Sequence, residues 1–278
     1  MKLKFLGTAA AEGVPAVFCN CDNCKRARLL GGKDIRTRSQ ILIDADTLFD
    51  FPMDTYMHAL MHGVDLSAVK HVLISHSHMD HCYPQEFIMR GGPFAHELTE
   101  KIVEVICNDK VREMFLADTA REIRPEVREN ISVTRVRPFE RLNRGDMTII
   151  PLPAAHTANE ECLVYYVERG GVGALLLNDT GVLDGDVYAR LYDMGGRAKA
   201  VTFDCTYGVK RHGPGRHMGL LDDVDQAELL LKKGVIDSRT KLICTHLSHN
   251  NAHDYAAMQV EADPFGFTVA YDGMEITI

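Results

Sequence analysis

The stretch that decides the fold of this chain is Ser75-His76-Ser77-His78-Met79-Asp80-His81. It directly follows 71–74, a short apolar run that predicts a buried strand. Alternate side chains of an extended chain share a face, so we expect His76, His78 and Asp80 to converge at the end of this strand, with His81 facing a second point. Imidazole and carboxylate groups are the usual ligands of Zn²⁺ and its first-row neighbours. The stretch therefore predicts a metal site, in preference to a polar loop with unrelated histidines.

The length, net charge and composition of the chain exclude several classes of protein. The chain has 278 residues and a formal net charge of -8 without a dense run of Lys or Arg, so we do not expect nucleic acid to be a partner. No apolar run approaches the ~20 residues that span a bilayer, and the start of the chain lacks the apolar middle of a signal peptide. We therefore expect a cytoplasmic protein with no membrane contact. In that compartment its eight cysteines should be metal ligands or reduced core thiols.

A second candidate metal site lies near the N-terminus. Cys19, Cys21 and Cys24 fall within six residues, a spacing at which three thiols can hold one ion and leave a position for a distant ligand. Free exposed thiols this close together would be easily oxidised. We expect a structural Zn²⁺ here, the alternative being free surface thiols.

The residue patterns also predict most of the secondary structure. Strands are expected over 2–6, 40–44, 47–51, 71–74, 103–107, 131–136, 147–152, 162–168, 173–177, 199–203, 241–244, 267–271 and 274–278. Helices are expected over 52–62, 109–122, 222–233 and 253–261, the second capped by Asp109 and the third by Asp222 or Asp223.

Three of these strands lead to a ligand-type residue: 147–152 to His156, 173–177 to Asp179 and 241–244 to His246. A sheet that gathers its strand ends along one edge would bring such dispersed residues into one site. Together with the first stretch they make five histidines and two aspartates. None of these ligands is a thiol, which suits hydrolysis at a hard oxygen centre.

This ligand set is large enough for two metal ions. The first ion could take His76, His78 and His156, and the second could take Asp80, His81 and His246. Asp179 could bridge them, because a carboxylate has two oxygens. Two ions ~3.5–4 Å apart hold a hydroxide between them at neutral pH and clamp both the attacking and the leaving oxygen of a displacement.

Two weaker candidates carry open alternatives. Asp44 and Asp46, at the end of a predicted strand, could orient metal-bound histidines through the second ring nitrogen, or could be turn residues. His58 and His62 lie four residues apart on a predicted helix, and without a nearby carboxylate we expect them to be a surface pair.

The motif His76-Ser77-His78-Met79-Asp80-His81, followed by His156, Asp179 and His246, resembles the signature of the metallo-β-lactamase superfamily. The resemblance covers nearly the whole chain. It implies an α/β protein built as an αββα four-layer sandwich, one domain over 1–278, with two divalent metals between the sheets. The segment from about 85 to 133 is longer than in the family and is expected to be an insertion. Zn²⁺, Mn²⁺ and Fe²⁺ all suit the ligands.

Within the superfamily, the chain resembles the phosphoribosyl 1,2-cyclic phosphate phosphodiesterases of the phosphonate (carbon–phosphorus lyase) pathway. The matching segments are Gly7-Thr8, Gly13-Val14-Pro15, the three-cysteine cluster, Thr245-His246-Leu247-Ser248-His249 and Asp272-Gly273-Met274-Glu275-Ile276. The resemblance implies that His249 is the fourth ligand of the structural Zn²⁺. It also implies that His217 acts near the leaving group.

The function expected from these features is hydrolysis of a small phosphorylated substrate, a cyclic phosphodiester, by a hydroxide that bridges the metals. Asp80 and His217 are the expected catalytic residues, with His217 as general acid. Lys210, Arg211 and Arg216 could hold a second phosphate, or could form a solvated basic loop. The protein could also be a homodimer.

Two other functions remain open on the sequence. One is a different hydrolase of the superfamily, either a broad phosphodiesterase or a tRNA 3′-end nuclease, although the acidic balance and the lack of a basic arm disfavour the nuclease. The other is a non-catalytic carrier that resembles the pyrroloquinoline quinone biosynthesis protein, which also has the thiol cluster. A carrier would have no need of all seven ligands.

Overall fold

The arrangement of the strands is that of two sheets packed face to face. The computed structural model describes residues 1–251 and 253–278. In spatial order the first sheet consists of β14 (Glu275–Thr277), β1 (Lys2–Gly7), β2 (Gln40–Ile43), β3 (Thr47–Phe49), β4 (His71–Leu73), β5 (Val103–Cys107) and β6 (Ile131–Arg135). The second consists of β13 (Phe267–Val269), β12 (Lys241–Thr245), β11 (Ala198–Asp204), β10 (Val172–Leu177), β9 (Leu163–Arg169), β8 (Met147–Pro153) and β7 (Leu142–Arg144).

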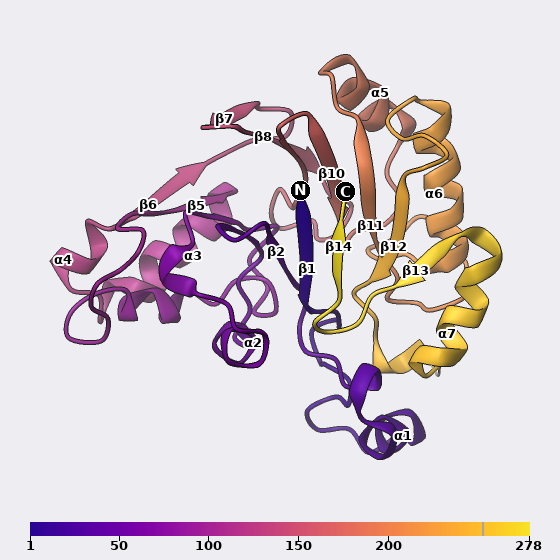
Figure 1. The fold of residues 1–278 in the computed structure, drawn as a ribbon, viewed down its shortest axis with the longest axis horizontal. Coiled ribbons are helices and arrows are strands. Elements are labelled where there is room, and N and C mark those ends of the chain that lie inside the picture. The colour runs from indigo at the N-terminus through magenta and orange to yellow at the C-terminus, as the bar shows by residue number, and fades with distance from the viewer. Residues whose placement is uncertain (252) are drawn as a thin grey trace.

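Helices cover the outer face of each sheet (Figure 1). The described helices are α1 (Asp22–Leu30), α2 (Thr55–His62), α3 (Asp109–Ala120), α4 (Pro125–Arg128), α5 (Gly185–Asp193), α6 (Leu220–Lys232) and α7 (Tyr255–Ala262). In Figure 1, α2, α3 and α4 lie on the side of the first sheet, and α5, α6 and α7 on the side of the second. None of the described helices is long and apolar enough to cross a membrane.

Three apolar clusters correspond to the interfaces between these layers. The cluster between the sheets includes Phe5, Phe49 and Tyr165. The cluster beneath the helices of the second sheet includes Tyr188 of α5, and the one beneath α3 includes Phe115. Each sheet thus buries apolar side chains on both faces, as a four-layer protein requires. The predicted αββα sandwich is confirmed.

The sequence prediction differs from the structure in a few elements. α1, α4, α5 and β7 were not predicted. α1 buries only Cys24 and Ala27 and so has no apolar stripe to detect, and α4 and β7 span only four and three residues. The cap of α3 is Asn108, whose side chain accepts a hydrogen bond from the Val111 amide, rather than Asp109. α6 begins at Leu220 after Gly219 as its N-cap residue, so Asp222 and Asp223 lie in the first turn. The Asp222 carboxylate still contributes to the cap, because it accepts a hydrogen bond from the Gly219 amide at 3.1 Å. The segment 85–133, which was expected to be an insertion, contains β5 of the first sheet together with α3 and α4.

The strand directions bring several chain segments to one edge of the sandwich. In the first sheet, the strands from β3 to β6 are parallel to one another. In the second sheet, the strands from β10 to β13 are parallel to one another. Strand β8 runs in the same direction as β10, because both are antiparallel to β9. The two sheets are joined at this edge by β9. The Tyr165 hydroxyl donates to the Ile74 carbonyl at 2.8 Å, and the Leu163 amide donates to the Ser75 carbonyl at 2.9 Å.

Replacement of Tyr165 by Phe should lower the free energy of unfolding by about 1–3 kcal/mol, because it leaves the buried Ile74 carbonyl without its donor. Urea titration of both proteins measures this difference. Tyr192→Phe, at an exposed position, is the control and should change the value by less than about 0.5 kcal/mol. Equal stability of Tyr165→Phe and wild type would show that this bond does not hold the sheets together.

Candidate metal centre

The stretch after β4 turns sharply instead of staying extended. The amides of His81 and Cys82 both donate to the His78 carbonyl, at 2.9 and 2.8 Å. The turn moves Asp80 beside His81, with Asp80 Oδ2 3.0 Å from His81 Nε2. The expectation that Asp80 shares a point with His76 and His78 was therefore wrong, since the alternation of an extended chain does not apply to a turn.

A first group of four donors consists of His76, His78, His156 and Asp179, whose ligand atoms all lie within 4.8 Å of one another. His76 Nε2 is 2.9 Å and His156 Nε2 is 3.2 Å from His78 Nδ1. Burial lowers the pKa of His76 and of His156, which favours their neutral rings. A neutral imidazole offers a lone pair, so this group can hold a cation.

A second group consists of Asp80, His81, Asp179 and His246, all buried and again within 4.8 Å of one another. His81 Nε2 lies 3.0 Å from Asp179 Oδ2 and His246 Nε2 lies 3.7 Å from the same oxygen. Three buried atoms in this group have no hydrogen-bond partner among the described residues: His81 Nε2, Asp179 Oδ1 and His246 Nε2. A cation between the groups would satisfy these atoms, so the residues fit a metal.

The charges of the second group also favour a cation. Burial raises the pKa of Asp80 and of Asp179, but the neighbouring imidazoles outweigh burial and hold both pKa values well below their usual range. Burial lowers the pKa of His81, but Asp80 and Asp50 more than offset it and raise that pKa well above its usual value. The two carboxylates are therefore ionised in a buried position, where they require a positive partner.

Asp50 is a residue of the centre that the sequence analysis missed. It follows β3 directly, is fully buried, and has a left-handed backbone with φ of 63°. Its Oδ2 lies 2.7 Å from His81 Nδ1, and its Oδ1 accepts from the Ser75 amide at 2.8 Å. Asp50 therefore orients His81 so that Nε2 faces the second group. Its position at the end of a strand was the available signal.

The weaker candidates lie elsewhere. Asp44 and Asp46 form ion pairs with Arg169 at 2.8 and 2.9 Å and contact no ligand histidine. His58 is fully buried, and both of its ring nitrogens contact polar side chains, at 2.7 and 2.6 Å, so the expectation of a surface pair was wrong for this residue. His62 is partly exposed.

His217 lies at the edge of the centre. Its Nδ1 is 3.0 Å from Asp179 Oδ1 and 3.0 Å from Asp204 Oδ2. Burial lowers the pKa of His217, but the adjacent Asp179 and Asp204 carboxylates raise that pKa to about 10. Asp204, at the end of β11, was not identified from the sequence, nor was Thr206, whose hydroxyl lies 2.9 Å from His246 Nδ1.

A cavity of about 330 Å³ opens over these groups. Its lining includes His78, Asp80, His156, Asp179, Arg216, His217 and His246, together with Glu12 and Asn250. Of the three basic candidates only Arg216 lines it. Arg211 forms an ion pair with Asp225 of α6, and Lys210 is exposed. The structure therefore places one cation of the predicted basic loop at the cavity.

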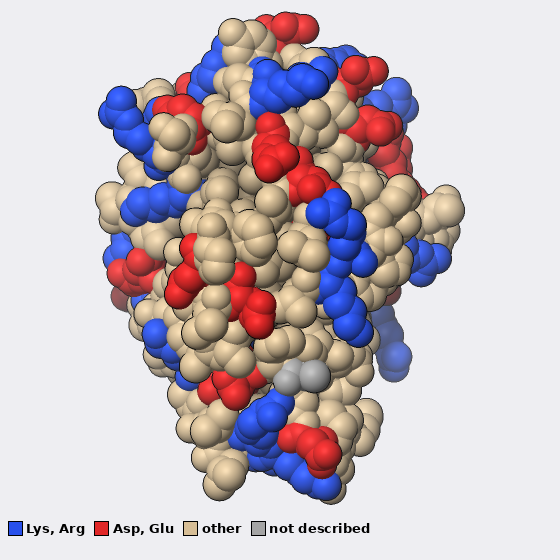
Figure 2. All heavy atoms as spheres, turned by 90° about the vertical axis from the view of Figure 1, so that its right-hand side faces the viewer, with Lys and Arg blue, Asp and Glu red and all other residues tan. Residues whose placement is uncertain are grey.

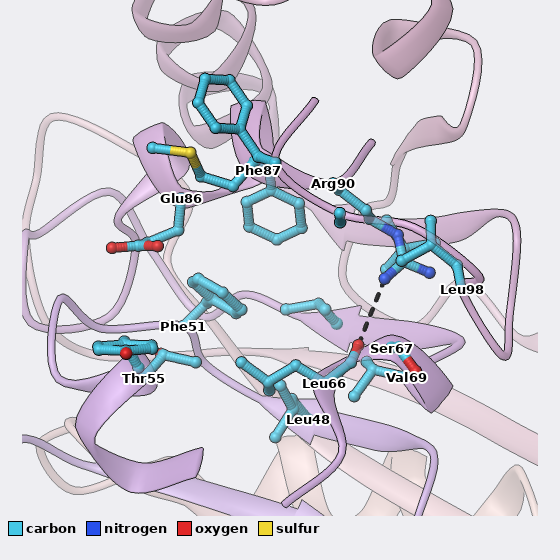
Figure 3. Close-up of a pocket in the computed structure, with 16 residues that line it drawn as sticks. Leu48, Phe51, Thr55, Leu66, Ser67, Val69, Glu86, Phe87, Arg90 and Leu98 are labelled. Carbon is cyan, nitrogen blue, oxygen red and sulfur yellow. Dashed lines mark hydrogen bonds between the residues drawn. The ribbon is translucent and has the colours of Figure 1, made fainter. Parts of the chain in front are cut away.

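A second, apolar pocket has no part in the centre. It has a volume of about 300 Å³ and is lined by Leu48, Phe51 and Phe87 among others, with the Arg90 side chain at one end (Figure 3). It lies beneath η3 (Pro84–Met89), and none of its lining residues belongs to a group that could hold a metal.

The thiols of the N-terminal cluster come together with one histidine. Cys19, Cys21, Cys24 and His249 place their ligand atoms within 4.8 Å of one another. His249 Nδ1 is 3.3 Å from Cys24 Sγ and 3.6 Å from Cys21 Sγ. A hydrogen bond from the Cys24 amide, followed by His249, lowers the pKa of Cys21 to about 6. Three thiols and an imidazole are a donor set that fits Zn²⁺. All eight cysteines are free.

Comparison with known proteins identifies the class. A family model described as the beta-lactamase superfamily domain matches residues 40–247, and the chain therefore belongs to the metallo-β-lactamase superfamily. No curated protein sequence matches the chain.

Solved structures share this fold over the whole chain. A new diphosphatase of the PhnP family has a TM-score of 0.74 at 20% identity, covering 100% of this chain and 97% of that one. Zn²⁺-bound PqqB from Methylobacterium extorquens has a TM-score of 0.68 at 17% identity, covering 100% of both chains. The short form of human tRNase Z has a TM-score of 0.68 at 16% identity, covering 100% of this chain and 99% of that one.

Replacement of Asp50 by Asn should weaken metal binding about 10–100-fold, because the His81 ring loses the carboxylate that orients it. Titration of metal-free protein with Mn²⁺ in a calorimeter measures the affinity. Asp193→Asn, which removes the same charge from an exposed position at the end of α5, should leave the affinity unchanged. An unchanged affinity in Asp50→Asn would contradict the assigned role of Asp50.

Proposed function

We propose that this protein is a metal-dependent hydrolase of phosphodiesters, with a cyclic phosphodiester of the phosphoribosyl 1,2-cyclic phosphate type as its substrate class. One observation carries the proposal: two donor groups share the Asp179 carboxylate and open into one cavity that also presents His217 and Arg216. The similarity to a PhnP-family diphosphatase supports phosphorus chemistry. Membership of the superfamily supports a hydrolase.

Each group has a role in this proposal. One divalent ion would be held by His76, His78 and His156. A second would be held by Asp80, His81 and His246, and Asp179 would contact both ions. When bound, two such ions lower the pKa of a water molecule and neutralise phosphoryl oxygens. Zn²⁺, Mn²⁺ and Fe²⁺ all suit this mixture of imidazole and carboxylate.

The protein's own side chains would handle the proton and the substrate's charge. Asp204 and Asp179 engage His217 Nδ1, which leaves Nε2 as the nitrogen that can give a proton to the departing oxygen. Arg216 would pair with a second anionic group of the substrate. Lys210 and Arg211 would act only at long range, because neither lines the cavity.

Replacement of His217 by Ala should slow hydrolysis of a ribose cyclic phosphodiester ~10²–10⁴-fold, because the sugar oxygen needs a proton to leave. The loss should be much smaller with bis-p-nitrophenyl phosphate, because p-nitrophenolate leaves without one. Initial rates on both substrates measure the contrast. Asp80→Ala should be inactive on both substrates, and His96→Ala, at an exposed position, is the control. Equal losses on the two substrates would rule out His217 as the acid.

The thiolate site should be structural. We propose that Cys19, Cys21, Cys24 and His249 bind one Zn²⁺. The variant Cys24→Ser should contain about one equivalent of zinc less than wild type, because a site with two remaining thiols binds zinc weakly. Element analysis checks this, and the melting temperature should fall with the zinc content. Asn20→Ser, in the same loop, should keep both values, and full zinc content in Cys24→Ser would contradict the proposal.

The nuclease and carrier alternatives are separated by two assays. The similarity to the short form of human tRNase Z keeps the nuclease open, whereas the net charge of -8 disfavours it. On the face shown in Figure 2, acidic and basic side chains are interspersed. Cleavage of a tRNA precursor would favour the nuclease. Failure to turn over any phosphodiester in the presence of Mn²⁺ would favour a carrier.

A further inference from the structure

Glu12 lies at the junction of the thiolate site and the catalytic cavity. Its Oε1 is 3.7 Å from Nε2 of His249, the ring nitrogen that faces away from the thiols. The same oxygen accepts a hydrogen bond from Ser248 Oγ at 2.5 Å. Glu12 also lines the cavity over the metal centre. Glu12 thus contacts a ligand of the thiolate site and also lines the catalytic cavity.

The backbone just before Glu12 is hydrogen-bonded to the segment that precedes His249. The Ala10 amide donates to the Leu247 carbonyl at 3.1 Å, and the Leu247 amide donates to the Thr8 carbonyl at 2.9 Å. The loop that contains Glu12 therefore runs beside the segment that contains His246 and His249. These two segments form one wall of the cavity, so a shift of either would move the other.

The contacts of His249 indicate which of its ring nitrogens carries the proton when an ion is bound. Nδ1 faces the sulfurs of Cys21 and Cys24, so it must be free of a proton to bind an ion there. The proton of a neutral ring then lies on Nε2, and Glu12 Oε1 lies 3.7 Å from that nitrogen, slightly beyond direct hydrogen-bond distance. Imidazoles that bind metals commonly give their second N–H to a carboxylate, which fixes the ring and strengthens the ligand.

We infer that Glu12 is a positioning residue of the thiolate site: its carboxylate orients His249 toward the ion, and Ser248 holds that carboxylate in place. This inference rests on the proposed Zn²⁺ at the thiol cluster. Because Glu12 also lines the cavity, the ion at the thiol cluster determines where a negative charge stands beside the catalytic centre. Arg216 lines the same cavity with a positive charge, so an anionic group of the substrate would lie toward Arg216 and away from Glu12.

Cobalt provides a readout of this site alone. Co²⁺ bound by thiolates shows a sulfur-to-metal charge-transfer absorption, which the histidine and aspartate ligands of the catalytic centre cannot produce. Full-length protein loaded with Co²⁺ is mixed with excess EDTA, and the decay of this absorption gives the release rate. Glu12→Ala should release Co²⁺ about 10–100-fold faster than wild type. Glu12→Gln, which keeps an acceptor oxygen, should fall between the two.

The matched control is Asp22→Asn, which removes the same charge from the first residue of α1. The Asp22 side chain is 99% exposed and pairs only with Lys25 among the described residues, at 3.6 Å. Its release rate should stay within about twofold of wild type. If Glu12→Ala also stays within that range while the absorption is present, the inference is wrong. If wild type shows no charge-transfer absorption, the thiolate site itself is refuted, and the proposed catalytic centre is unaffected.

Discussion

The structure depends on one buried carboxylate that five imidazoles surround. The side chain of Asp179 is 2% exposed, and its oxygens lie within 3.0 to 3.7 Å of His76, His81, His156, His217 and His246. An ionised carboxylate in such a place is stable only with positive charge nearby. The strands that end at this point converge because the two sheets pack with their ligand-bearing ends at one edge.

Backbone strain is concentrated at the same place. Six described residues other than glycine have a positive φ, and three of them belong to the centre: Asp50, Asp179 and His246, at 63°, 56° and 57°. Each follows the end of a strand and turns its side chain toward the centre. Such conformations cost roughly 1–3 kcal/mol each and persist where the surrounding structure enforces them. Here the enforcing structure is the pair of sheets, joined by Tyr165 and Leu163 beneath the His76–His81 turn.

The sequence was sufficient for the features that short patterns encode. The strand ends leading to His156, Asp179 and His246 were visible because each strand is an apolar run followed by a polar residue. The Cys19, Cys21 and Cys24 cluster was visible from its spacing. What the sequence could not show were contacts that only the tertiary fold creates. In the sequence, Asp50 and Asp204 are aspartates at strand ends, and both contact the centre. Asp44 and Asp46 also lie at a strand end, but they form ion pairs with Arg169 away from the centre. Neither the local sequence pattern nor the charge distinguishes the aspartates that contact the centre from those that do not.

The central claim of the proposed function is that Asp179 would join two metal ions in one centre. The most direct test is electron paramagnetic resonance of the metal-free protein reconstituted with Mn²⁺. Two ions that share the Asp179 carboxylate should be exchange-coupled, and the coupled spectrum should be lost in Asp179→Asn at equal Mn²⁺. A spectrum of isolated Mn²⁺ only, in wild-type protein at saturating metal, would contradict a dinuclear centre at these residues.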